Sequence, residues 1–472
     1  MTFYWSIQMK KNQILWGVAI GIIFSASCST KQKETWNIPV EKSVFNEENA
    51  VKDSGSKEFK ATSAIDTVKD MKTGWNLGNT LEVPQNNLSA ETAWQPTKTS
   101  QDIIDFVKEQ GFRSVRIPCA WHAHFMPSTT TIDETWMKRV KEVVDYCIND
   151  GMYVVLNSHW DGGWLENSFT DTSEATVTAK CDTLKQIWTQ IANEFKDYDN
   201  KLLFAGLNEP AVENATQMTA LLRYEQAFID AVRATGGNNS DRVLVIQGPT
   251  TDIDKTVNLM NTLPTDTAVD KLALEVHYYA PWNFWGMMND ESWGNMFFYW
   301  GSENHVSGSS HNATYGEEDF LMEQLDKIGN IFPDKHIPII IGEYGANWRN
   351  IKGTGESQEK HNASIKHFYK TLNIEAMKRG MAPMVWCTNY ANRPSMTIIN
   401  RSNLSIYNQY AMDGIKEALS SSRIVCPENT APPSPMARNV VFDLQGRVVS
   451  DDISHIGRTS GIYIYNGKTV RL

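Results

Sequence analysis

The chain has 472 residues, 41% of them hydrophobic, so it is long enough to bury a large core. Its formal net charge is -11 at pH 7, and the absence of a basic stripe excludes nucleic acid as a partner. None of the six cysteines has the spacing of a zinc ligand, and we interpret those after residue 28 as mostly buried small hydrophobic residues.

The N-terminus has the layout of a signal peptide. Lys10 and Lys11 precede an apolar stretch over 14–24 that is too short to span a bilayer, and small residues then lead to Cys28. This segment resembles a bacterial lipoprotein cleavage site, which implies removal of residues 1–27 and lipidation of Cys28. Ordinary signal peptidase cleavage that leaves a free Cys28 is the alternative. Residues 28–63 are polar and aperiodic, which is typical of a tether.

Residues 64–422 alternate between short apolar runs and longer amphipathic stretches. The pattern predicts an α/β fold, a (β/α)8 TIM barrel with elaborated loops, and the alternative is a doubly wound sheet. The barrel is favoured because no glycine-rich nucleotide-binding motif follows an early strand. The amphipathic stretch 133–150 repeats its apolar residues near the helical period of 3.6. We expect strands at 73–77, 114–118, 153–158, 202–207, 243–247, 272–277, 337–342 and 383–388.

The C-terminal residues 423–472 are predicted to form a linker and a small β-rich module. Proline-rich 431–435 is the linker, and the segments 439–450 and 461–472 each alternate apolar and polar residues around a turn. This tail resembles the C-terminal module of many secreted Bacteroidetes proteins, which implies a sorting or packing element.

Two glutamates occur in segments of nearly matching design. The segment LLFAGLNEP contains Asn208 and Glu209, and IPIIIGEYG contains Glu343. In each, an apolar strand breaks at Gly or Pro, and one Glu is expected just past its C-terminal end, where active sites of parallel barrels lie. Two carboxylates on different strands are the minimum apparatus for cleaving a glycosidic bond. Solvated loop residues are the alternative for either glutamate alone.

Other strand ends supply the residue types that such chemistry needs. Arg116 can keep a nucleophilic carboxylate ionised, His277 and Tyr279 can hold its oxygens, and Asn208 can bond a sugar 2-hydroxyl. Each residue alone also has a purely structural interpretation, such as a hydrogen-bonded core histidine. We predict no cofactor and no metal, because neither a carboxylate nor a cysteine lies at useful spacing from His122 and His124. The remaining candidates are His159 in support, and Trp386, Asn76, Trp121, His124, Trp160 and Trp282 in substrate binding.

The motifs together resemble the bacterial cellulases of glycoside hydrolase family 5 over residues 64–422. They are GWNLGNTLE, ETAW, VRIPCAWHAH, VVLNSHWD, LNEP, VHYYAP and IGEYG. The resemblance implies that Glu209 is the acid/base and Glu343 the nucleophile, with Arg116, His159, Asn208, His277, Tyr279 and Trp386 in support. The opening motif is most similar to the subfamily of endo-β-1,4-glucanases that also take xyloglucan or mixed-linkage glucan.

We therefore expect a secreted, monomeric, retaining endo-β-1,4-glucanase whose partner is a β-linked polysaccharide or oligosaccharide. The alternatives are an endo-β-1,4-mannanase of the same family and a catalytically silent glycan-binding lipoprotein. Departures after His159 and Trp386 leave the exact polysaccharide open. The only expected membrane association is the lipid anchor, periplasmic or at the cell surface. A periplasm-facing anchor is favoured because no acidic cluster follows Cys28, although the C-terminal module favours export.

Overall fold

The computed structural model describes residues 59–335, 337–392 and 394–425, together with four short strands within 441–471. The predicted signal peptide, Cys28, Cys426 and the proline-rich linker lie outside the described residues. Within the described part of the chain, no helix combines the length and the apolar character needed to cross a bilayer.

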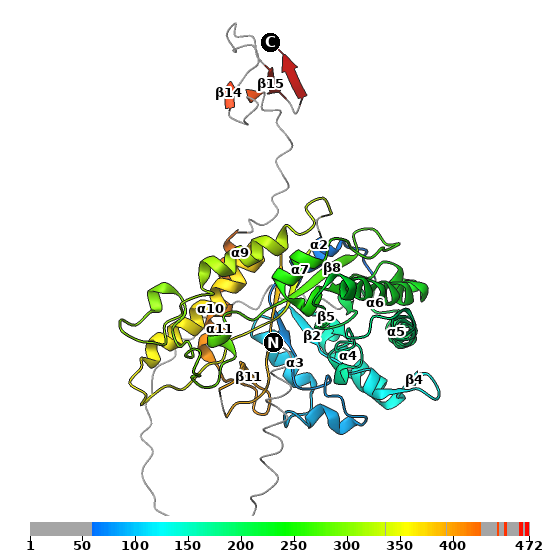
Figure 1. Cartoon of the computed structure of the whole chain (residues 1–472), viewed down its shortest axis with the longest axis horizontal. Helices are drawn as coiled ribbons and strands as arrows, with labels where there is room; N and C mark the ends of the chain where they lie inside the picture. The colour runs from blue at the N-terminus through cyan, green and yellow to red at the C-terminus, as the bar shows by residue number, and fades with distance from the viewer. Residues whose placement is uncertain are drawn as a thin grey trace, which may run out of the picture. The chain divides into compact units, whose positions relative to one another are not determined.

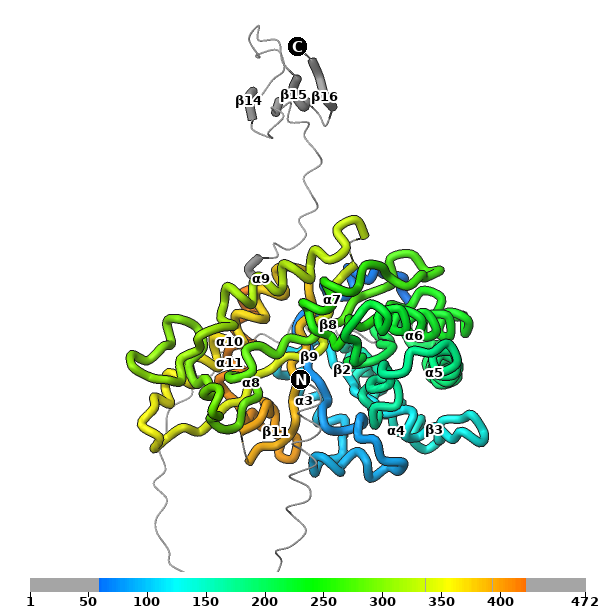
Figure 2. Tube along the Cα trace, in the orientation of Figure 1, coloured from blue at the N-terminus to red at the C-terminus, as the bar shows by residue number. Residues whose placement is uncertain are grey.

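Eight parallel strands close into a barrel, which confirms the (β/α)8 prediction and excludes the open doubly wound sheet. The barrel closes where β1 pairs with β10, so the early and late parts of the chain meet there (Figure 2). All eight predicted strands are present, with ends that differ by a few residues. They are β1 (Gly74–Asn76), β2 (Ser114–Ile117), β5 (Tyr153–Asn157), β6 (Leu202–Ala205), β7 (Leu244–Gln247), β8 (Leu272–Tyr278), β9 (Ile339–Tyr344) and β10 (Ala382–Val385).

Helices surround the barrel because each buries one apolar stripe against the strands. Figure 1 shows α4, α5 and α6 along one side and α9, α10 and α11 along the other. In α4, the Asp133 carboxylate caps the first turn by accepting from Trp136 N at 2.9 Å, and the helix lies where the apolar periodicity of residues 133–150 predicts one. The helices are α2 (Ala64–Met71), α3 (Gln101–Glu109), α4 (Glu134–Asn149), α5 (Glu174–Glu194), α6 (Ala215–Ala234), α7 (Ile253–Leu259), α8 (Trp282–Trp285), α9 (Glu318–Gly329), α10 (Gln358–Lys378) and α11 (Gln409–Val425).

Shorter elements lie in the loops. Two small hairpins pair antiparallel, β3 with β4 and β11 with β12. The bounds of these elements are β3 (Phe125–Met126), β4 (Thr131–Ile132), β11 (Ile399–Asn400), β12 (Ser405–Ile406), and the 3-10 turns η1 (Leu88–Thr92), η2 (His122–His124), η3 (Asp161–Gly163), η4 (Gly237–Ser240), η5 (Pro249–Thr251) and η6 (Ser302–Asn304).

The barrel interior is apolar at one end and polar at the other. Helix α2 closes the N-terminal end, where Ala64, Val68 and Met71 pack with inward-facing strand residues such as Val155 and Ile340. Side chains alternate between the two faces of a strand, so every second residue faces the barrel interior. The later inward-facing residues of each strand therefore lie nearer to the C-terminal end. There the interior residues are charged, and this end carries the site described below.

The C-terminal strands form a four-stranded antiparallel sheet of their own, in the order β14-β13-β15-β16. The strands are β13 (Val441–Phe442), β14 (Val448–Ser450), β15 (Ile462–Tyr465) and β16 (Lys468–Arg471).

Four cysteines of the barrel, Cys119, Cys147, Cys181 and Cys387, are free and buried, which confirms the prediction for these four.

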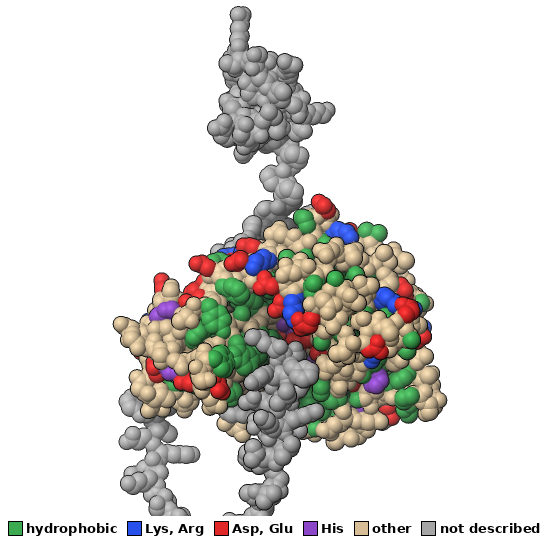
Figure 3. All heavy atoms as spheres, viewed as in Figure 1, with side chains coloured by type: hydrophobic (Ala, Val, Ile, Leu, Met, Phe, Trp, Pro, Cys, Tyr) green, Lys and Arg blue, Asp and Glu red, His purple; other side chains and the backbone are tan. Residues whose placement is uncertain are grey.

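On the face shown in Figure 3, acidic side chains are spread over the surface with a few basic ones between them.

Candidate active site

The two glutamates meet at the C-terminal end of the barrel. Glu209 follows β6 by four residues, whereas Glu343 lies inside β9, so the prediction that Glu343 lies past its strand is wrong. A register shift between Val276 and His277 pairs His277 with Glu343 and turns both toward the same site. One oxygen from each glutamate and a ring nitrogen of His277 lie within 4.8 Å of one another. The two carboxylates therefore face each other across a short gap, as the double-displacement mechanism of a retaining glycosidase requires.

Arg116 is fully buried beneath Glu343 and connects four strands. Its guanidinium donates to Glu343 Oε1 at 2.8 Å, to Asn208 Oδ1 at 2.8 Å and to Asn76 Oδ1 at 3.0 Å. Its Nε lies 2.9 Å from Glu275 Oε1, an ion pair outside hydrogen-bond geometry. A cation in this position orients Glu343 through a charge-assisted hydrogen bond.

Asn76 supports Arg116 and does not reach the cleft. Its side chain is fully buried, and its Nδ2 donates to Gly342 O at 2.8 Å and to Met384 O at 3.1 Å. The prediction that Asn76 binds substrate is therefore wrong, because both ends of its amide are used inside the barrel.

The second oxygen of Glu343 faces Tyr279. The Tyr279 hydroxyl donates to Glu343 Oε2 at 3.1 Å, so each carboxylate oxygen has its own donor. The Tyr279 ring packs on Trp285, with centroids 4.5 Å apart. Of the two glutamates, Glu343 is thus the one held rigidly, with 8% of its side chain exposed against 21% for Glu209.

His277 bridges the acidic groups. Its Nδ1 lies 2.8 Å from Glu209 Oε1 and its Nε2 lies 3.2 Å from Glu275 Oε1. Burial alone lowers the pKa of this ring, but the negative charges of Glu343, Glu209 and Glu275 outweigh burial and raise the pKa of His277 to about 10. The ring therefore carries a positive charge at neutral pH and donates from both nitrogens.

Burial raises the pKa of Glu343 above its ordinary value, and the charge of Glu209 acts in the same direction. His277 and Arg116 oppose this rise because their positive charges favour the carboxylate form. The effect of Arg116 on the Glu343 pKa thus has the predicted direction, although burial outweighs it.

We expect Arg116→Ala to move the acidic limb of the kcat/KM profile to higher pH. Removing the cation takes away an interaction that favours ionised Glu343, so its pKa rises and a higher pH is needed to ionise it. The measurement is kcat/KM against pH on a soluble β-glucan. Arg116→Lys, which keeps the charge, is the control and should shift the limb less. A folded, active Arg116→Ala enzyme with an unmoved limb would contradict this account.

His159 and Trp386 lie together on another side of the site. Their rings stack at 5.8 Å with an interplanar angle of 11°, and Asn157 Nδ2 lies 3.2 Å from His159 Nδ1. Burial, reinforced by the charges of Arg116 and His277, lowers the pKa of His159 well below its ordinary value, so the ring is neutral. Gly78 lies against Trp386, because a Cβ there would be 2.8 Å from the indole.

Two further predicted substrate contacts are wrong. Trp121 is fully buried, and its Nε1 donates to Asn157 O at 2.9 Å. His124 is 1% exposed and stacks on Trp136 at 3.7 Å. Both residues fold back under the loop after β2, where they pack and do not face the cleft.

Two other predicted substrate contacts, Trp160 and Trp282, keep part of their side chains accessible to a substrate. Trp160 and Trp282 are each half-buried. Trp282 packs edge-on against Trp285, with centroids 4.8 Å apart, in the aromatic segment that also contacts Tyr279. In this long loop Tyr299 and Trp300 are fully buried, as expected for rings that hold the loop in place.

The sequence interpretation missed two buried acids, Glu275 and Glu166, and gave no role to a third, Asp161. Glu275 lies below His277 on the inner face of β8 and pairs with Arg116. The carboxylate of Asp161 accepts from the backbone N–H groups of Trp121, His122 and Ala123 and so ties together the loops after β2 and β5. Glu275 was detectable as a charge inside an apolar strand, two residues before His277 and therefore on its face. Gly342 leaves room for it, because a Cβ there would collide with the Glu275 carboxylate.

The second missed acid is Glu166, which is 5% exposed and lies beside Asn208 and Glu209. Nothing in its sequence neighbourhood marks it, because it lies in a loop with no apolar periodicity.

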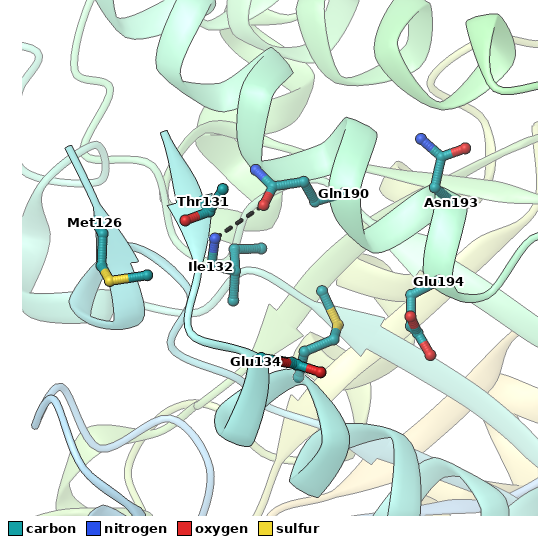
Figure 4. Close-up of a pocket in the computed structure, with 8 residues that line it drawn as sticks. Met126, Thr131, Ile132, Glu134, Gln190, Asn193 and Glu194 are labelled. Carbon is teal, nitrogen blue, oxygen red and sulfur yellow. Dashed lines mark hydrogen bonds between the residues drawn. The ribbon is translucent and has the colours of Figure 1, made fainter. Parts of the chain in front are cut away.

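A surface pocket elsewhere carries no comparable chemistry. It lies between the β3–β4 hairpin, the start of α4 and the end of α5, and Figure 4 shows Gln190 accepting from Ile132 N, at 2.9 Å. Its two acids, Glu134 and Glu194, already pair with Lys138 and Lys141. None of the active-site residues described above lines this pocket.

A (β/α)8 barrel with two facing carboxylates at its C-terminal end, one of them held by an arginine and a tyrosine, defines the class of glycoside hydrolases. Residues 66–392 match the family model for Cellulase (glycosyl hydrolase family 5). The chain belongs to this family.

Relatives of the chain include named β-glucanases. It is 35% identical over 390 residues to Endoglucanase A of Clostridium longisporum, covering 79% of this chain and 68% of that protein. A solved xyloglucan-specific β-1,4-glucanase from a ruminal metagenomic library is 48% identical, with a TM-score of 0.72, and the match covers 76% of this chain and 97% of that one. A Bacteroides ovatus family 5 xyloglucanase in complex with a XXXG heptasaccharide is 31% identical, with a TM-score of 0.68 and coverage of 76% and 77%.

Proposed function

We propose that this protein is a retaining endo-β-1,4-glucanase in which Glu343 is the nucleophile and Glu209 the acid/base. The observation that carries the proposal is the unequal environment of two carboxylates that lie close together. Glu343 accepts from Arg116 and Tyr279, which favours an ionised, oriented nucleophile. Glu209 is the more exposed carboxylate, which suits a group that exchanges protons with substrate and water.

Cleavage then proceeds in two displacements. In the first, a Glu343 oxygen bonds to C1 of the sugar while the C1–O bond to the leaving chain breaks, and Glu209 gives its proton to the departing oxygen. In the second, Glu209 takes a proton from water, the water oxygen bonds to C1, and the Glu343 ester bond breaks. Arg116, His277 and Tyr279 hold the carboxylates throughout, and the pair of His159 and Trp386 borders the sugar that reacts.

The substrate class is a β-1,4-linked glucan, and we propose xyloglucan as the preferred member. The support comes from the relatives, since those reported above are named for endoglucanase or xyloglucanase activity. The same names favour glucan over mannan. A binding protein without catalysis is disfavoured because both glutamates and their supporting groups are in place. The proposed sugar contacts are Trp386, Trp160 and Trp282, whereas Asn208 keeps its predicted bond to the 2-hydroxyl as a proposal.

A panel of purified polysaccharides tests the function. Xyloglucan, carboxymethyl cellulose, mixed-linkage glucan and β-mannan are compared for release of reducing ends and for loss of viscosity. We expect the fastest release on xyloglucan, with viscosity falling early because an endo-acting enzyme cuts within the chain. Faster cleavage of mannan would overturn the substrate assignment, and the absence of cleavage on all four would overturn the enzymatic one.

We also propose that the protein is exported and anchored through a lipid on Cys28, with its anchor facing the periplasm. The support is the signal-like N-terminus and the polar stretch after it. Cys28→Ala is expected to move the protein from the membrane fraction to the soluble fraction or leave it unprocessed. Protease treatment of whole cells decides the side of the membrane, since loss of the protein would place it on the surface.

A further inference from the structure

Glu166 lies beside the proposed acid/base but has no part in the two displacements. It lies between η3 and α5, in the loop that follows β5, and its side chain is 5% exposed. A buried carboxyl is costly unless its oxygens find donors, so its partners identify what it does.

The partners of Glu166 all belong to one short segment. Its Oε2 accepts from Glu209 N at 3.2 Å and from Asn208 Nδ2 at 3.4 Å. Its main-chain carbonyl accepts from Ala211 N at 3.0 Å. Three bonds from one residue therefore hold the turn that presents the Glu209 carboxyl.

The opposite side of this segment is held by the barrel. Leu207 N donates to Gln247 Oε1 at 2.8 Å, and Thr250 N donates to Pro210 O at 2.7 Å. The loop after β5 thus holds this segment from one side, and β7 with the loop after it holds it from the other. Glu166 makes the hydrogen bond nearest to Glu209.

We propose that Glu166 is a positioning residue for the acid/base, fixing the main chain of Glu209 and the side chain of Asn208 so that the Glu209 carboxyl reaches the glycosidic oxygen. This inference rests on the proposed acid/base role of Glu209. Proton transfer requires a heavy-atom distance of about 2.6–3.2 Å, and a displacement of about 1 Å can cost about 100-fold in rate.

The protonation state of Glu166 also affects the electrostatic environment of the Glu209 carboxyl. The titratable groups that face it are Glu209 and Glu343. Burial, followed by the negative charge of Glu209, raises the pKa of Glu166 well above its usual range, which favours the neutral carboxyl. A neutral acceptor holds the Glu209 segment without adding a third negative charge to the pair.

The test measures kcat/KM on two kinds of aryl β-glycoside with the same sugar. One has a leaving group that needs protonation, and the other, a dinitrophenolate, needs almost none. Glu166→Ala is expected to lower kcat/KM about 10–100-fold on the first and by less than about threefold on the second. Glu166→Gln keeps an uncharged acceptor and should retain most activity with an unmoved alkaline limb. Should Glu166→Ala fail to fold, Glu166→Asp, which withdraws the carboxyl by one methylene, is expected to repeat the leaving-group dependence more weakly.

Glu91 provides the matched control. It is 2% exposed, and its carboxylate accepts from Thr99 N at 2.7 Å and from Arg139 Nε at 2.9 Å without contacting Glu209 or its segment. Any loss in Glu91→Gln should be equal on both leaving groups. Equal losses on both in the Glu166 variants would overturn the proposal, and an alkaline limb moved to lower pH in Glu166→Gln would refute the neutral state. The acid/base assignment fails separately, if Glu209→Ala itself has no leaving-group dependence.

Discussion

Glu343→Ala is expected to lower kcat/KM on xyloglucan about 10⁴-fold or more, equivalent to about 5.5 kcal/mol of transition-state stabilisation. The reason is that no other carboxylate is placed to bond to C1. Arg116 and Tyr279 would then face an empty space in place of the two oxygens that they hold. The measurement is reducing-end release by purified enzyme, with thermal unfolding to show that the variant is folded.

Rescue of Glu343→Ala by azide tests whether Glu343 is the nucleophile. In Glu343→Ala a small anion can enter the space left by the carboxylate and attack C1 directly while Glu209 protonates the leaving group. The product from a β-glycoside is then an α-glycosyl azide, formed with inversion. Glu134→Ala is the matched control, because Glu134 is 83% exposed and pairs only with Lys138 within its own helix. Near wild-type activity in Glu343→Ala would remove Glu343 from the mechanism.

Glu209→Ala is expected to be nearly as damaging on polysaccharide, with kcat/KM lower by on the order of 10³-fold or more. On a dinitrophenyl glycoside the loss in kcat/KM should be far smaller, because this leaving group departs without a proton. Comparing the two substrates at one pH separates loss of the acid from loss of the fold.

The second displacement provides an independent readout for Glu209. Without a base to activate water, the glycosyl-enzyme of Glu209→Ala should accumulate on the activated substrate. Azide needs no base, so it should release the sugar as a β-glycosyl azide with retained configuration. An α-glycosyl azide from Glu209→Ala would instead make Glu209 the nucleophile and Glu343 the acid/base. Equal losses on polysaccharide and on the dinitrophenyl substrate would show that Glu209 is not the acid.

The sequence and the structure agree most closely where the signal is local. A strand buried on both faces of a barrel needs an uninterrupted apolar run, so all eight strands could be predicted within a few residues. Glu209 could be placed at the mouth because Asn-Glu-Pro ends such a run. Glu343 lies inside β9 and not past its end, because β9 continues beyond Gly342, the residue that the pairing with β8 skips between Ile341 and Glu343.

The aromatic and polar candidates were harder to assign from residue type. Trp386 and Trp121 both follow barrel strands, yet Trp386 keeps 8% of its surface exposed and stacks on His159, whereas Trp121 is fully buried. The difference depends on the loop after β2, which the Asp161 carboxylate draws inward through three backbone N–H groups from another loop. No pattern along the chain encodes that contact, because its two halves lie 38–40 residues apart.

The sequence by itself therefore determined the barrel and its two opposed glutamates, because strand burial and strand ends follow from neighbouring residues. Only the tertiary structure decided which groups serve those glutamates. Glu275 and Glu166 become partners of Arg116 and Glu209 through packing between strands and loops far apart in the chain. Asn76 loses its predicted contact with substrate in the same way, since its amide is used up by backbone carbonyls inside the barrel. The physical reason is that burial of a polar group depends on donors and acceptors supplied by distant segments.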